Sequence, residues 1–126
     1  MKHLVTHILW IVLSVCLLTG CGGRRDISED FQNEDPKVRI SAIRRAGSEK
    51  LESSVPYLVD RLSDSEADVR MFAIIALEKI TGETHGYRHY DDSASRNEAI
   101  DRWRKWLVDN KFEQVTPKPV EKRKTG

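Results

Sequence analysis

The feature that most constrains the fold is an internal repeat with a period of 31 residues. At this offset Val38-Arg39 aligns with Val69-Arg70, and Ala42-Ile43 aligns with Ala73-Ile74. A fixed period of this length is typical of stacked copies of one supersecondary unit. We therefore expect a repeat architecture in which neighbouring copies bury their apolar sides against each other.

Apolar residues recur at helical spacing in two consecutive segments of the second copy. The first segment contains Val55, Leu58, Val59 and Leu62, and the second contains Val69, Phe72, Ala73, Ala76, Leu77 and Ile80. Pro56 suits the first turn of a helix, and Gly82 suits a helix end. The polar residues 63–66 between them are typical of a turn. The repeated unit is therefore predicted to be a helical hairpin.

Two strings carry a resemblance to a known family. They are Asp35-Pro36-Lys37-Val38-Arg39-x-x-Ala42 and Val69-Arg70-x-x-Ala73-x-x-Ala76-Leu77. Both resemble HEAT repeats, particularly the short bacterial type, over residues 27–82 and more loosely as far as the Trp103/Trp106 segment. The resemblance implies an all-α fold: a short α-solenoid of two HEAT-like helical hairpins with a C-terminal capping helix.

The expected domain spans residues 27–112, with repeats at about 27–47 and 53–82. Helical spacing of Ala99, Ile100, Trp103, Trp106 and Leu107 predicts the capping helix at about 96–108. Solenoid ends require such a cap. Residues 113–126, with two prolines and mixed charge, are expected to form a disordered tail.

The N-terminus has the order of a secretory signal, with Lys2 before an apolar stretch from Leu4 to Leu18. The run Leu18-Thr19-Gly20-Cys21 resembles the lipobox of bacterial lipoproteins. The resemblance implies that residues 1–20 are a signal peptide and that Cys21 becomes a lipidated N-terminus, followed by a short tether over 21–26. The expected location is a bacterial cell membrane or outer membrane, with the domain facing the periplasm or the exterior.

Two alternatives for this segment stay open. It could remain as a spanning helix, although it is shorter than the roughly 20 residues that crossing a bilayer requires. It could also be an ordinary secretory signal that leaves Cys21 as a thiol. After removal of residues 1–20, which contain Cys16 and the cation Lys2, one cysteine and a balance of 20 basic and 20 acidic residues remain. No intramolecular disulfide can then form, and a nucleic-acid partner is disfavoured.

A second apolar face is predicted on the second helix of each repeat. In HEAT repeats the positions concerned are normally polar, whereas here they include Ile40 and Ile43 in one copy and Met71, Ile74 and Ile75 in the other. These five are the candidate partner-binding residues. The loop 83–94 and the Trp103/Trp106 helix could cover this face, or it could form a groove for a partner segment. A patch exposed without a binding role is the third alternative.

Charged residues suggest a structural ladder. Arg39 and Arg70 occupy equivalent positions, and the resemblance implies that such arginines pair with acidic residues along the solenoid. Asp64 and Asp68 are the candidate partners, although a direct role of the arginines in partner contact is the alternative. A small basic strip on the first repeat is explained equally well as a solvated helix face. It consists of Lys37, Arg44 and Arg45.

Other chemistry has little support in the sequence. A metal site at His85 and His89 is disfavoured because Gly86 opposes the helix that would bring the two rings together. An aromatic platform for a sugar is conceivable, but core packing explains the tryptophan spacing better; its members would be Tyr87, Tyr90, Trp103 and Trp106. No nucleophile–base pair or phosphate-binding loop is present, so we expect no catalytic residue, no cofactor and no enzyme activity.

These patterns together predict a membrane-anchored interaction or scaffold module of the bacterial cell envelope, with an unknown envelope protein as its partner. A lipoprotein that binds a glycan through the aromatic residues is the main alternative. An accessory subunit of an envelope enzyme is a further one.

Overall fold

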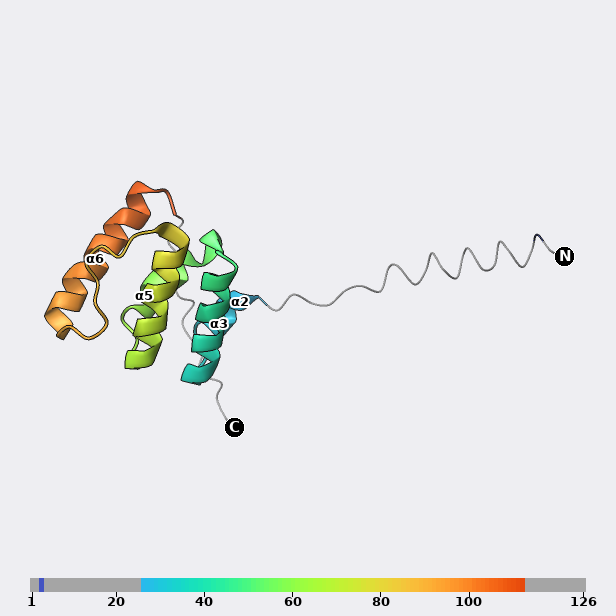
Figure 1. The fold of residues 1–126 in the computed structure, drawn as a ribbon, viewed down its shortest axis with the longest axis horizontal. Helices are drawn as coiled ribbons and strands as arrows, with labels where there is room; N and C mark the ends of the chain where they lie inside the picture. The colour runs from blue at the N-terminus through green and yellow to red at the C-terminus, as the bar shows by residue number, and fades with distance from the viewer. Residues whose placement is uncertain (1–2, 4–25, 113–126) are drawn as a thin grey trace, which may run out of the picture.

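The computed structural model describes His3 and residues 26–112, and all regular structure in that part of the chain is helical (Figure 1). The elements are α2 (Ile27–Asp30), α3 (Pro36–Ser48), the 3₁₀ helix η1 (Glu52–Ser54), α4 (Val55–Arg61), α5 (Ala67–Thr81) and α6 (Ser93–Asp109). The expected all-α class is confirmed. Apart from His3, the expected signal peptide, together with Cys21 and the expected tail 113–126, lies outside the described residues.

Local sequence explains where the two long repeat helices begin and end. At the start of α3, Asp35 Oδ1 accepts a hydrogen bond of 2.9 Å from the Lys37 backbone N–H, and Pro36 occupies the first turn. Both are standard devices at a helix N-terminus. At the end of α5, Gly82 adopts φ 78° and its N–H donates to the Glu78 carbonyl at 2.8 Å. A residue with a Cβ would be strained in that left-handed conformation.

The first four helices form two stacked hairpins. α2 pairs with α3, α4 pairs with α5, and α3 then packs along α5. Figure 1 shows α3 and α5 side by side and running in the same direction, as expected for equivalent helices of consecutive repeats. The arrangement is a short α-solenoid.

The core lies between the two hairpins and continues under α6. It contains Phe31 from the first repeat, Leu58 and Leu77 from the second, and Trp103 from α6, all of them fully buried. The Phe31 ring also stacks on Tyr57 with 5.5 Å between centroids. Burial of each such side chain contributes about 1.5–3 kcal/mol, so these residues tie the consecutive repeats together.

The outward orientation expected for Ile43 and Ile74 is wrong. Their side chains are 0% and 7% exposed and belong to the core. The buried positions of α3 are Arg39, Ala42, Ile43, Ala46 and Gly47. This i, i+3, i+4, i+7, i+8 spacing describes a single helix face, which is centred near Ile43. The sequence interpretation had centred that face on Val38, which is only half-buried.

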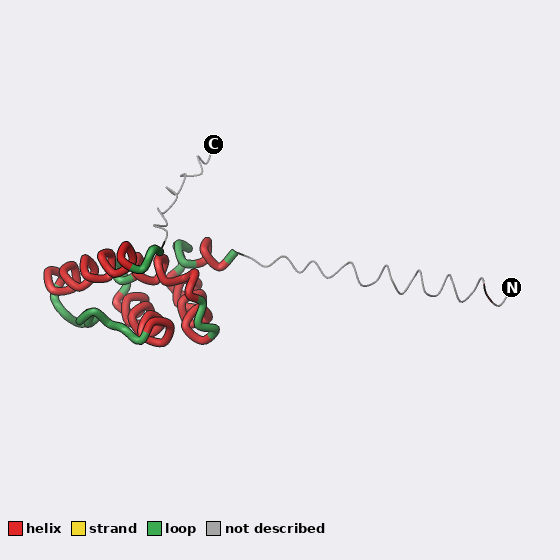
Figure 2. The backbone as a smooth tube through the Cα atoms, turned by 90° about the horizontal axis from the view of Figure 1, so that it is seen from above, coloured by secondary structure: helices red, strands yellow, loops and turns green. Residues whose placement is uncertain are grey.

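The last helix, α6, begins three residues earlier than the expected capping helix. Asp92 caps it, because its Oδ1 accepts a hydrogen bond of 2.9 Å from the Ser95 backbone N–H. This bond also lowers the pKa of the Asp92 carboxyl. α6 packs mainly against α4 and is tilted relative to α5 and α3 (Figures 1 and 2).

The connecting segment 82–92 between α5 and α6 is not helical, yet it is fastened to the second hairpin and to α6. The Tyr87 hydroxyl donates to the Leu62 carbonyl at 2.7 Å, and Trp103 Nε1 donates to the Thr84 carbonyl at 3.1 Å. These bonds, one buried and one partly buried, hold the segment against the core. None of the helices that the structure describes is both long enough and apolar enough to cross a membrane.

Candidate functional site

A buried arginine joins the two repeats. Arg39 Nη1 donates to the carbonyls of Asn33 and Glu34 at 2.6 and 3.0 Å. Its Nη2 donates to Asp64 Oδ1 at 3.0 Å, and its Nε approaches Oδ2 at 2.9 Å as an ion-pair contact without hydrogen-bond geometry. Asp64 Oδ1 also accepts the Glu66 backbone N–H at 3.0 Å. One carboxylate therefore orders the turn before α5 and holds the first repeat to it.

Arg70 repeats part of this arrangement in the second copy. Its Nη1 donates to the carbonyls of Asp64 and Ser65 at 2.8 and 3.0 Å, the positions equivalent to Asn33 and Glu34. Its other expected partner, Asp68, is exposed and forms no ion pair within the described part of the chain. Asp68 is therefore not a member of the ladder.

A third ladder arginine, Arg96, lies on α6 and was missed by the sequence interpretation. It donates to the Asp91 carbonyl five residues upstream, as Arg39 and Arg70 do to Glu34 and Ser65. The string Arg-x-x-Ala-Ile begins at all three arginines and could have revealed the match. The third copy starts 26 residues after the second, not 31, because the segment 82–92 replaces a first helix. The expected cap is thus the second helix of an incomplete third repeat.

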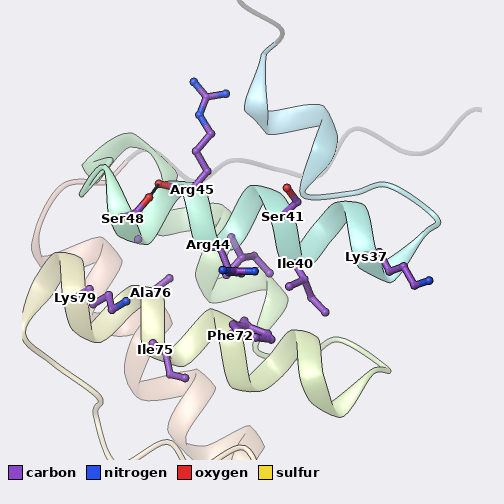
Figure 3. A pocket seen from close by; sticks show the side chains of 12 residues that line it. Lys37, Ile40, Ser41, Arg44, Arg45, Ser48, Phe72, Ile75, Ala76 and Lys79 are labelled. Atoms are coloured by element: carbon purple, nitrogen blue, oxygen red, sulfur yellow. Dashed lines mark hydrogen bonds between the residues drawn. The ribbon is translucent and has the colours of Figure 1, made fainter.

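The side of α3 and α5 away from the core carries a groove, here called the α3–α5 groove (Figure 3). It has a volume of about 410 Å³. Its apolar floor and walls come from Ile40, Ile43, Gly47, Phe72, Ile75 and Ala76. Ile40 and Phe72 are half-buried, whereas Ile75 is 39% exposed. Volumes of this order accommodate a few side chains or a small ligand.

The expected partner-binding residues divide between this groove and the rest of the molecule. Ile40 and Ile75 line the groove, and Ile43 contributes to its floor from the core. Ile74 is buried elsewhere in the core, and the half-buried Met71 is not among the lining residues. Phe72 was assigned to the core stripe by its spacing, yet it lines the groove.

Helix packing shapes one end of the groove. A Cβ on Gly47 would lie 3.0 Å from the Ala76 Cβ and 3.1 Å from its Cα, closer than side-chain carbons ordinarily approach. α3 and α5 therefore meet closely at Gly47 and Ala76 only because one side chain is absent and the other is small. Ile40 and Phe72 lie further along the same groove, toward the helix N-termini (Figure 3).

The rim of the groove is basic. The charged residues that line it are Lys37, Arg44, Arg45 and Lys79, and none of its lining residues is acidic. Arg45 points away from the groove and pairs with Glu49 at 3.0 Å (Figure 3). Lys37, Arg44 and Lys79 form no ion pair with any residue that the structure describes. The groove therefore presents three uncompensated positive charges around an apolar floor.

No described residue beyond Lys79 lines the groove. The expectation that the loop 83–94 and the tryptophan helix cover the apolar face is wrong for this groove, because α6 packs against α4 instead. Within the described chain the α3–α5 groove stays open to solvent.

The aromatic residues do not form a platform for a sugar. Trp103 is 0% exposed and Tyr87 is buried, and burial raises the Tyr87 pKa. Trp106 stacks on Phe112 with 5.5 Å between centroids, and Tyr90 is exposed in the connecting segment. His85 packs edge-on against Trp103 at 4.4 Å. In the part of the chain that the structure covers, no group of three His, Cys, Asp or Glu residues is placed to hold a metal ion.

The chain matches a known protein family. A family model described as HEAT repeats matches residues 28–108, which is more than half of the chain. No curated protein and no solved structure matches the chain. The family match spans the two complete hairpins and α6, the elements that the arginine ladder connects. The chain therefore belongs to the HEAT-repeat family.

Proposed function

We propose that this protein is a membrane-tethered interaction module of the bacterial cell envelope, which binds a segment of another protein in the α3–α5 groove. HEAT repeats commonly act as protein-interaction scaffolds. The observation that carries the proposal is the apolar floor of the groove, which no later element of the described chain covers. Contiguous exposed apolar surface rimmed by polar residues is typical of interaction sites.

The proposal assigns a binding role and no reaction. The ladder arginines and Asp64 are committed to holding the repeats together, so their charges are used structurally. The groove itself contains three uncompensated cations, two serines and apolar side chains, without a base beside either hydroxyl. This composition suits recognition of a ligand rather than nucleophilic catalysis.

Membrane attachment is the second part of the proposal and is supported by the lipobox-like run ending at Cys21. Acyl chains on this cysteine would contribute about 0.8 kcal/mol for each buried methylene, so two chains form a stable anchor. Gly22 and Gly23 would then connect the anchor to a domain that begins four residues later. The groove would stay close to the membrane and meet partners of the same compartment.

The groove is tested by Ile75→Asp in the full-length protein, purified with its partners from detergent-solubilised envelope after crosslinking. The matched control is Val108→Asp, since Val108 is also an exposed apolar residue on a helix but lies on α6. We expect Ile75→Asp to abolish capture of the partner and Val108→Asp to retain it. Both variants should keep their helical circular-dichroism spectrum. Equal capture by the two variants would overturn the binding role of the groove.

The anchor is tested independently by Cys21→Ser. Metabolic labelling with a palmitate analogue should mark the native chain and leave the variant unlabelled. The variant should also be lost from the detergent-soluble membrane fraction. Labelling of the variant, or unchanged membrane retention of the unlabelled variant, would contradict lipid anchoring at this residue.

A further inference from the structure

We infer that the occupant of the α3–α5 groove is an acidic amphipathic helix of a partner protein. This inference rests on the proposed function and specifies the chemistry of the partner. It follows from the charges along the rim, from the shape of the groove, and from the hydrogen-bonding state of the helices that form it.

The three uncompensated cations are distributed along the whole groove. Lys37 lies near the start of α3, Arg44 lies between the two helices, and Lys79 lies near the end of α5 (Figure 3). The 31-residue repeat places Lys79 level with Ser48, so Lys37 and Lys79 are eleven helical residues apart, or about 16 Å along the axis. A partner with carboxylates separated by about three helical turns would meet both ends of this rim.

Apolar contacts lie between the charged ends. Ile40 and Phe72 form one continuous apolar area with Ile75, and Gly47 and Ala76 close the far end. A volume of about 410 Å³ has room for a few large side chains but not for a folded domain. Two apolar side chains at i and i+3 or i+4 on an occupant helix fit such a floor, as in other helix-in-groove complexes.

A helix suits this groove better than an extended strand. The groove is formed by two helices whose backbone groups bond within each helix, so it offers no free strand edge. An extended segment would bury its own N–H and C=O groups against apolar side chains without partners. A helix satisfies these groups internally and presents only side chains.

The C-terminal tail and the described surface of a second copy are poorer occupants than an acidic helix. Residues 113–126 carry four basic and two acidic residues, so the rim cations would repel this tail. In a second copy, the large apolar residue exposed on a described helix outside the groove is Val108. The cations one turn before it, Arg104 and Lys105, pair with Asp101 and Asp109, so this surface offers no excess of negative charge to the rim. A membrane surface is also disfavoured, because Ile40 and Phe72 are half-buried in the groove and do not protrude.

The test is selection from a charge-unbiased phage library of 14-residue helix-forming peptides, panned against the full-length protein in detergent. Peptides of net negative charge, with apolar residues at i and i+3 or i+4, should be enriched. Arg44→Glu should raise the Kd of the best-binding peptide by roughly 5- to 10-fold, because an attraction between opposite charges becomes a repulsion between like charges. Lys105→Glu is the matched control and should change Kd by less than about 2-fold, because this exposed side chain lies on α6 and does not line the groove.

The outcomes separate this inference from the proposed function. One outcome is that the enriched peptides are neutral or basic, and that Ile75→Asp abolishes their binding whereas Arg44→Glu does not. This would confirm the groove as a binding site but overturn the inference that its partner is acidic. Peptides whose binding is insensitive to Ile75→Asp would overturn both. A third outcome is that no peptide is enriched but the protein binds phosphatidylglycerol vesicles, and that Arg44→Glu abolishes this vesicle binding. That outcome would overturn the acidic helix and make an anionic lipid surface the occupant of the groove. Thermal melts of each variant confirm that the domain is folded.

Discussion

The two junctions between repeats are built differently. At the first, α3 and α5 lie side by side, Arg39 pairs with Asp64, and an open groove remains on the outer side. At the second, the first helix of the third repeat is missing, and the segment 82–92 fills its place with Tyr87. The complete hairpin thus leaves an open groove, whereas at the incomplete repeat aromatic residues close the core.

The ladder shows the same contrast. Arg39 has an acidic partner in the following repeat, whereas Arg70 forms no ion pair with any residue that the structure describes. Tyr87 lies close enough to Arg70 for the guanidinium to oppose the rise in the tyrosine pKa that burial causes. The first junction therefore adds a buried ion pair to its apolar packing, whereas the second relies on aromatic packing.

The largest expected effect comes from removing the aromatic closure of the second junction. Trp103→Ala should lower the free energy of unfolding by about 3–5 kcal/mol, because it leaves a large cavity and removes the indole bond to Thr84. Urea denaturation followed by circular dichroism measures the loss. Trp106→Ala is the comparison, since this ring is only half-buried, and it should cost less. A loss below about 1 kcal/mol for Trp103→Ala would show that α6 contributes little to the domain.

The first junction should respond most strongly to loss of its carboxylate. Asp64→Ala should destabilise the fold by about 3 kcal/mol, because Arg39 would stay buried without a counter-charge. Asp68→Ala is the matched control on the adjacent turn, and it should change stability by less than about 0.5 kcal/mol. Equal effects of the two variants in denaturant titrations would mean that the ion pair does not hold the repeats together.

A smaller effect is expected where α3 and α5 approach each other. Gly47→Ala adds a Cβ that would lie 3.0 Å from the Ala76 Cβ. Overpacking costs about 1–3 kcal/mol, and the better helix propensity of alanine returns up to about 1, so the net loss should be about 1 kcal/mol. Ser48→Ala, at an exposed neighbouring position, should be nearly neutral in the same thermal melts. A stabilised Gly47→Ala variant would show that the two helices can separate freely.

The smallest effect concerns pH at the second junction. Burial raises the pKa of Tyr87 above its ordinary value of 10.0, so the unfolded chain releases this proton at lower pH than the folded chain does. The resulting stabilisation is fully present below pH 10 and declines as the pH rises through the folded-state pKa. The urea midpoint should therefore fall more steeply above pH 10 in the native chain than in Tyr87→Phe. If the urea midpoints of the two proteins fall in parallel above pH 10, burial of the Tyr87 hydroxyl does not stabilise this junction.

Much of the fold could be predicted from the sequence, because the complete repeats share one period. The match of Val38-Arg39 with Val69-Arg70 indicated two hairpins, and the spacing of Trp103 and Leu107 indicated a further helix. The third repeat escaped a search at a fixed period, since the missing helix shortens the offset before Arg96. A search for Arg-x-x-Ala-Ile at variable spacing would have found it.

The candidate site was harder to predict for a geometric reason. The outward orientation expected for Ile43 was wrong because the core face of α3 was centred on Val38, an error of about one residue, or about 100° of rotation. In α5 the equivalent Val69 is buried as expected, and Ile74 is buried as well because the buried face of this helix is broader. Phe72 looked like a core residue by spacing, but whether such a residue is covered depends on how far apart two helices lie. That separation is set by Gly47 and Ala76, and helix periodicity within one segment does not report it.

The central claim is that the α3–α5 groove is the docking surface, and photocrosslinking in cells tests it most directly. A photoreactive amino acid would replace Ile75 in the groove or, as the control, Val108 on α6. The account predicts that position 75 crosslinks to one partner protein through an acidic helical segment, while position 108 yields no such product. The same crosslinked product from both positions, or crosslinking from position 108 alone, would contradict it.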